Sequence, residues 1–144
     1  MADTLQVAFY KGRTRFFNRL VSWWLNGPYS HAELILVTDA GGYAACASSS
    51  FLDGGVRLKY MRLDPAHWDI VDVQGDKATA WAWLKEHEGD AYDTFGLLGL
   101  VWRRGKGNPD KVWCTESVAA MLGYDEPWRF DPMTLYVTLT RGKT

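Results

Sequence analysis

The chain has 144 residues, of which 47% are hydrophobic and 15% aromatic, so we expect a single domain (1–144) with one packed core. Its 16 basic and 17 acidic residues give a formal net charge of −1, which offers no reason to expect a nucleic acid or an anionic membrane as partner. The first residues, MADTLQVAFYKGRT, lack a basic leader and an apolar signal core. No run approaches the ~20 apolar residues of a membrane span. We therefore expect a protein that is cytoplasmic as synthesised and has no membrane span.

The first half of the chain predicts strands around one helix. LQVAFY (5–10) is typical of a strand, and TRFFNRLVSWWLNG (14–27) places apolar residues at helical spacing. SHAELILV (30–37) and GYAACASS (42–49) predict two strands joined by a turn in TDAG. GGVRLKYMRL (54–63) alternates apolar and basic residues and predicts a half-exposed strand. HWDIVDV (67–73) predicts another strand.

The second half of the chain predicts helices. Asp76 is suited to cap a helix over KATAWAWLKEHE (77–88), and Gly89 is suited to end it. DTFGLLGLVWRR (93–104) predicts a second helix, and RGKGNPDK (104–111) predicts an exposed basic loop. Strands followed by helices, without long linkers or repeats, indicate an α+β fold with a small antiparallel sheet packed against helices.

One of the two cysteines, Cys114, stands where a last helix is predicted to begin. Val118, Ala119 and Leu122 form its apolar stripe, and Gly123 is suited to end it. At a helix N-terminus the unpaired N–H groups and the macrodipole favour an anion, which makes a thiolate available and can later stabilise an oxyanion. The alternative is a small apolar core residue, because free cysteine is among the most buried residue types.

A thiolate nucleophile normally needs an imidazole partner, and the chain has three histidines. His67 lies in a predicted loop and His87 near a helix end, so we expect both to face solvent. His31 opens a strand, where period-two alternation places it on the same face as Glu33 and opposite Ala32. A strand-borne histidine and a helix-start cysteine are the two parts that papain-type cysteine hydrolases require. The alternative is a strand end whose polar side chains merely face water.

PYSHAELIL followed far downstream by WCTESVAAML resembles the circularly permuted branch of the NlpC-type papain-like superfamily, which includes the YiiX-like and lecithin:retinol-acyltransferase-like proteins. SSSFLDGGVRLK and AYDTFGLLGL are similar to phage and prophage members. The resemblance implies a permuted papain-like fold, with Cys114 as nucleophile and His31 as general base and acid. The strand after His31 lacks the second histidine of acyltransferase-like members, so Glu33 is favoured as the orienting residue, with Ser48 as the alternative.

The resemblance implies a cysteine (thiol) hydrolase that acts on an amide bond, with a peptidoglycan peptide as substrate. The alternatives are a thiol-dependent lipid or small-molecule acyltransferase or esterase, and a non-catalytic phage accessory protein that keeps the fold. Tyr10, Ser48 and Trp113 are candidate substrate-binding residues. Virion association or release at lysis would bring the protein to a cell wall, and the oligomeric state is left open. No cofactor or metal is expected, since the cysteines and histidines lack zinc-ligand spacing and no glycine-rich phosphate loop follows a strand.

Overall fold

The computed structural model describes residues 3–12, 27–92 and 113–141. Within these ranges five strands and three α-helices form an α+β fold, which confirms the predicted class. The predicted helices over 14–27 and 93–104, and the predicted loop over 104–111, lie outside the described residues. No helix in the described ranges is long and apolar enough to cross a membrane.

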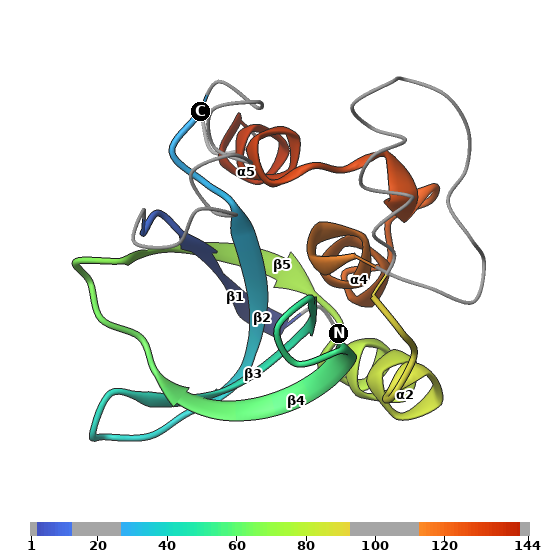
Figure 1. Cartoon of the computed structure of the whole chain (residues 1–144), viewed down its shortest axis with the longest axis horizontal. Coiled ribbons are helices and arrows are strands. Elements are labelled where there is room, and N and C mark those ends of the chain that lie inside the picture. The colour runs from blue at the N-terminus through green and yellow to red at the C-terminus, as the bar shows by residue number, and fades with distance from the viewer. Residues whose placement is uncertain (1–2, 13–26, 93–112, 142–144) are drawn as a thin grey trace.

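All five predicted strands are present and form one antiparallel sheet in the order β4-β3-β2-β1-β5. The predicted turn joins β2 to β3, where the Asp39 carboxylate accepts hydrogen bonds from the N–H groups of Gly41 at 2.8 Å and Tyr43 at 3.1 Å. Figure 1 shows that the sheet is strongly curved. β4 and β5 are its two edge strands. The strands are β1 (Asp3–Tyr10), β2 (His31–Thr38), β3 (Tyr43–Ser50), β4 (Gly55–Arg62) and β5 (Trp68–Gly75).

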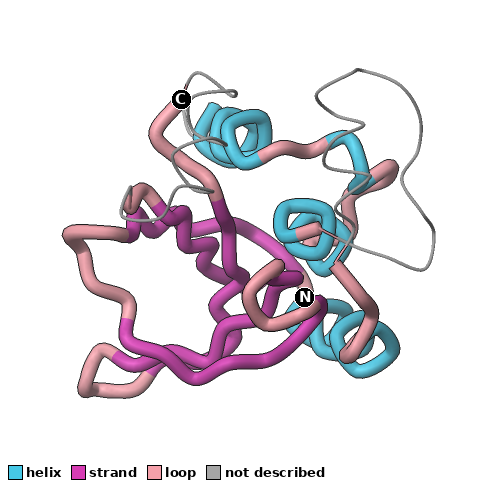
Figure 2. The backbone as a smooth tube through the Cα atoms, in the orientation of Figure 1, coloured by secondary structure: helices cyan, strands magenta, loops and turns pink. Residues whose placement is uncertain are grey.

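Three helices lie together on one side of the sheet (Figures 1 and 2): α2 (Lys77–His87), α4 (Cys114–Met121) and α5 (Pro132–Arg141). A short 3-10 helix, η1 (Pro127–Arg129), connects the last two. The sheet face toward these helices and the helices themselves enclose the main apolar core. This core includes Val7, Phe9, Leu34, Val73, Leu84, Val118, Met121 and Leu135.

The helix ends follow capping chemistry. Asp76 caps α2 by accepting a hydrogen bond from the Ala78 N–H at 3.1 Å, as predicted, and Gly89 follows the helix with a φ of 96°. α4 begins at Cys114, as predicted. The sequence pattern did not indicate α5, whose three threonines and one valine are β-branched and favour helices weakly. Asp131 compensates by accepting from the N–H of Thr134 at 2.8 Å.

The alternation predicted for β2 is confirmed. Ala32, Leu34 and Leu36 belong to the main core between the sheet and the helices. Ile35 belongs to a second, smaller apolar cluster on the other face of the sheet. That cluster comprises Ala8, Ile35, Ala44 and Cys46, with Met61, Leu63 and Trp68 packed against it. The start of β2 therefore carries His31 and Glu33 on the face that turns away from the main core.

Candidate active site

The first turn of α4 is fixed against strands β2 and β3 by three buried serines. The Ser117 hydroxyl donates to the backbone oxygen of Cys114 at 2.6 Å and accepts from the N–H of Ser49 at 2.9 Å. The Ser48 hydroxyl donates to the carbonyl oxygen of Ala32 at 2.7 Å and lies 3.4 Å from the Cys114 oxygen. Because Ser48 and Ser117 connect the first turn of α4 to β3, and Ser48 connects β3 to β2, Cys114 is held beside the beginning of β2.

The other side of the α4 N-terminus is fixed by the segment that follows the helix. The indole N–H of Trp113 and the hydroxyl of Thr115 both donate to the carbonyl oxygen of Phe130, at 3.1 and 2.5 Å. Glu116, in the first turn, accepts from the N–H of Trp113 at 3.4 Å. Cys114 thus lies between two anchored neighbours, which gives its thiol a defined position.

His31 is hydrogen-bonded to both the thiol and a carboxylate. Its Nε2 lies 2.8 Å from Oε1 of Glu33, and the ring also interacts with the Cys114 side chain. Burial alone would lower the pKa of His31, but the neighbouring Cys114 and Glu33 side chains outweigh burial and raise this pKa to about 10. A cationic imidazole beside a thiol is the environment in which a thiolate is stabilised.

Glu33 is almost completely buried, with 1% of its surface exposed, and it is held as a carboxylate. Arg57 binds it with two parallel hydrogen bonds, Nη1 to Oε2 at 2.7 Å and Nη2 to Oε1 at 2.5 Å. Burial disfavours the charge, but Arg57 and His31 together hold the pKa of this carboxyl below its usual range. The carboxylate therefore stays an acceptor for His31 and fixes the orientation of the ring.

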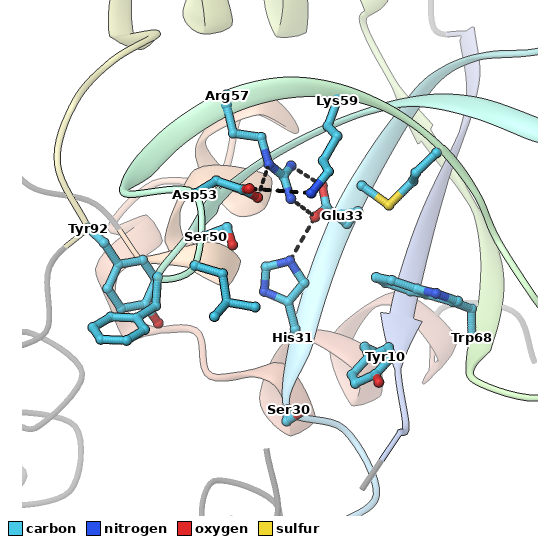
Figure 3. A pocket seen from close by; sticks show the side chains of 13 residues that line it. Tyr10, Ser30, His31, Glu33, Ser50, Asp53, Arg57, Lys59, Trp68 and Tyr92 are labelled. Atoms are coloured by element: carbon cyan, nitrogen blue, oxygen red, sulfur yellow. Dashed lines mark hydrogen bonds and ion pairs between the residues drawn. The ribbon is translucent and has the colours of Figure 1, made fainter. Parts of the chain in front are cut away.

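Two further charges complete the cluster (Figure 3). Asp53 accepts from Nε of Arg57 at 2.8 Å and from Nζ of Lys59 at 3.3 Å. Arg57 and Lys59 hold the pKa of Asp53 below its usual value, although burial opposes this. The Arg57 guanidinium is thus shared by two carboxylates, one of which contacts the candidate catalytic histidine.

Sequence reasoning did not identify Arg57 as a site residue and predicted only that its strand is half-exposed. In the structure 16% of the Arg57 side chain is exposed, whereas 51% of the Lys59 side chain is exposed, and Leu58 and Tyr60 on the opposite face of β4 are exposed as well. A carboxylate at a buried strand position requires a cation. A prediction that Glu33 is buried would have implied a cationic partner, and the alternating Arg57 and Lys59 are the candidates on a nearby strand.

A pocket of about 300 Å³ opens beside His31 on the sheet face away from the main core (Figure 3). Tyr10, next to His31 in the register of β1 and β2, contacts the indole of Trp68 edge-on at a ring-centroid distance of 5.0 Å. Cys114, of which 4% is exposed, is not among the lining residues, and the His31 ring joins it to this space. The pocket is lined by Tyr10, Ser30, His31, Glu33, Ser50, Phe51, Leu52, Asp53, Arg57, Lys59, Met61, Trp68 and Tyr92.

The structure brings together Cys114, His31 and Glu33, and it places Tyr10 on the pocket wall. The other two candidate substrate-binding residues lie elsewhere. Ser48 and Trp113 are buried, do not line the pocket, and use their polar atoms to hold backbone oxygens. Their side chains support the position of α4.

The remaining cysteine and histidines lie apart from this cluster of catalytic candidates. Cys46 is a free, buried thiol, and burial, helped by Glu33, raises its pKa to about 12. His67 is half-exposed near Asp64, and His87 stacks on Trp83 at a centroid distance of 4.3 Å. Within the described ranges, no group of three or more His, Cys, Asp or Glu side chains could hold a metal ion.

The chain was compared with protein-family models, with curated proteins and with solved structures, and none of the three comparisons gave a match.

Proposed function

We propose that the protein is a cysteine hydrolase in which Cys114 is the nucleophile, His31 the general acid and base, and Glu33 the orienting carboxylate. One observation carries the proposal, namely the hydrogen-bonded series from the Cys114 thiol through His31 to the buried Glu33. It supports thiol chemistry because each member has the partner that its role requires: the thiol an imidazole, and the imidazole a fixed acceptor.

In the proposed acylation step the Cys114 thiolate attacks the carbonyl carbon of an amide. A C–S bond forms, and the carbonyl π electrons move to the oxygen. The backbone N–H groups around Cys114, at the N-terminus of α4, are suited to stabilise that oxyanion. The intermediate then collapses, the C–N bond breaks, and the His31 imidazolium gives its proton to the leaving amine.

Deacylation reverses the roles. Neutral His31 removes a proton from a water molecule, which attacks the thioester carbonyl and forms a C–O bond. The C–S bond breaks, the acid product leaves, and the Cys114 thiolate and His31 imidazolium are restored. Glu33 keeps the ring oriented through both steps and does not itself need to change its protonation state.

The substrate and the finer fold are proposed from the resemblance stated above. We propose a permuted papain-like fold and, as substrate, an amide bond of a peptidoglycan peptide, in a phage or prophage context. A second candidate, transfer of an acyl group to an amine or hydroxyl, is favoured by the aromatic and aliphatic side chains of the pocket wall, which suit an apolar acyl group. A non-catalytic protein that retains the fold is the third candidate.

The test is labelling with an electrophilic thiol probe, followed by a screen of muropeptides against acyl lipids. Labelling of wild type and of Cys46→Ala, but not of Cys114→Ser, is the expected result, and His31→Ala should slow it strongly. Turnover of muropeptides then supports the hydrolase, and acyl exchange supports the transferase. A Cys114 thiol that no probe modifies in the folded protein would overturn both enzymatic proposals.

A further inference from the structure

Ser30 immediately precedes β2 and lines the pocket beside His31. Its backbone is fixed, since its N–H donates to the carbonyl oxygen of Tyr10 at 3.1 Å, and 5% of its surface is exposed. Its hydroxyl oxygen is buried and has no hydrogen-bond partner, and it is the one such side-chain atom in the described part of the chain. A buried hydroxyl without a partner lowers stability, so its presence at a pocket wall calls for a bound group.

The charged groups of the pocket leave no charge for a ligand to neutralise. Glu33 and Asp53 contribute two negative charges and Arg57 and Lys59 two positive charges, and all four are joined by hydrogen bonds. Only protonation of His31 adds a charge, and that imidazolium already contacts Glu33 and Cys114. A charged ligand group would have to break these pairs, at the expense of leaving a charge buried and unpaired.

Apart from Ser50, which carries a hydroxyl, the rest of the lining is apolar or aromatic. The apolar and aromatic members are Tyr10, Phe51, Leu52, Met61, Trp68 and Tyr92. A pocket of about 300 Å³ with such walls and the buried, unpartnered Ser30 hydroxyl fits a small, largely apolar group that carries an uncharged hydrogen-bonding oxygen.

We propose that this pocket binds an uncharged, apolar amino-acid residue of the acyl substrate, and that the Ser30 hydroxyl donates a hydrogen bond to the amide carbonyl oxygen of that residue. The inference rests on the proposed function for the direction of the substrate, because the pocket adjoins His31. Ser30 is then a substrate-binding residue that selects a neutral residue over an acidic one.

Binding can be measured apart from thiol catalysis in the Cys114→Ser protein, which lacks the thiol nucleophile. The probes are N-acetyl-L-phenylalaninamide, which is apolar and uncharged, and N-acetyl-L-glutamic acid amide, which carries a carboxylate. NMR titration should show that the phenylalanine probe binds more tightly. In Cys114→Ser/Ser30→Ala its Kd should rise about tenfold, the value of one lost hydrogen bond. An unchanged Kd, or tighter binding of the acidic probe, overturns the proposal.

Stability supplies a matched control, because Ser48 is a second buried serine whose hydroxyl does have a partner, the Ala32 oxygen. Ser48→Ala should lower the melting temperature, since it leaves that bond unmade. Ser30→Ala should keep or raise the melting temperature, because it removes a hydroxyl that no group in the free protein satisfies. A fall in Ser30→Ala as large as that in Ser48→Ala would mean a structural role and overturn the proposal.

The two levels of inference fail separately. Probe binding that depends on Ser30, together with a Cys114 thiol that electrophiles do not modify, would reject the hydrolase and keep the pocket assignment. A reactive Cys114 without probe binding would reject the pocket assignment and keep the hydrolase.

Discussion

Cys46 and Cys114 are almost equally inaccessible, with 0% and 4% of their surfaces exposed, but their surroundings differ completely. Cys46 lies in the small apolar cluster with Ala44 and Ile35, and its Sγ is 3.6 Å from the Ala44 carbonyl oxygen. Cys114 opens α4 and is hydrogen-bonded to His31. Exposure alone would class both as inert core residues. What separates them is the helix terminus and the imidazole of His31, which interacts with Cys114.

Glu33 acts on both thiols, and its effects reach them by different routes. Its charge raises the pKa of Cys46, after the larger effect of burial, and so keeps that thiol protonated. Burial lowers the pKa of His31, but Cys114 and Glu33 both raise it. Glu33 therefore helps to keep a cation beside Cys114. One carboxylate therefore suppresses ionisation at the structural cysteine and supports the cation at the candidate nucleophile.

The largest expected effect compares the two thiols directly. At pH 6, iodoacetamide should modify Cys114 at least about 100-fold faster than Cys46, because Cys114 stands at a helix N-terminus beside the His31 imidazole, whereas burial raises the pKa of the Cys46 thiol. Rates measured by mass spectrometry in Cys46→Ala and in Cys114→Ser isolate each site. The His31→Ala substitution in the Cys46→Ala background should remove most of the advantage. Similar slow rates at both sites, appearing only above pH 8, would end the distinction between them.

The next effect concerns the stability of the cluster. Arg57→Leu removes the main partner of the buried Glu33 carboxylate and should lower the free energy of unfolding by about 3 kcal/mol. Urea denaturation followed by circular dichroism measures this loss. The double substitution Arg57→Leu/Glu33→Leu removes both charges and should recover part of it. A double variant no more stable than the single one would show that packing, and not an unpaired charge, causes the loss.

Glu33→Gln should make the two thiols more alike. The amide keeps the shape of the side chain, and Arg57 keeps Asp53, so the loss of stability should be only about 1 kcal/mol. Without the carboxylate the pKa of Cys46 and the pKa of His31 should both fall. Turnover of an activated ester should decrease about tenfold, and its loss at alkaline pH should begin at a lower pH, since the His31 proton is released earlier. Wild-type activity with an unshifted pH profile would remove Glu33 from the mechanism.

The smallest effect is the acid limb of stability. The pKa of Glu33 is below its usual value in the folded protein, so its contribution is complete above the unfolded value of about 4.3. It is lost as the pH falls through the lower, folded pKa. Wild type should therefore lose more stability than Glu33→Gln between pH 5 and pH 2.5 in parallel melting experiments. Parallel curves for the two proteins would show that the carboxylate contributes nothing specific.

Local patterns in the sequence predicted the parts of the fold that depend on neighbouring residues. Period-two alternation placed His31 and Glu33 on the face of β2 opposite Ala32, and the apolar stripe after Cys114 placed that residue at a helix start. Both observations follow from the geometry of one element. Each of these two predictions is independent of how the rest of the chain folds.

The partner of Glu33 could not be predicted in the same way, because it depends on strand order. Arg57 lies on β4, two strands away from β2, and is paired in register with Ser48 on β3. The intervening strand, YAACASSS, carries mostly small side chains, which leaves room for a long arginine to cross it. Sequence reasoning considered Ser48 itself as the orienting residue, yet its small size is what makes Arg57 the neighbour of Glu33.

The hydrogen bonds that fix α4 to β3 join Ser117 to Ser49, residues far apart in the chain. During synthesis His31 and Glu33 therefore emerge long before Cys114 exists, and the nascent sheet has no nucleophile beside its imidazole. Long-range contacts of this kind form late and slow folding. The Cys114 thiol meets the His31 imidazole only when the C-terminal helices dock, so the order of residues along the chain brings the two candidate catalytic groups together last.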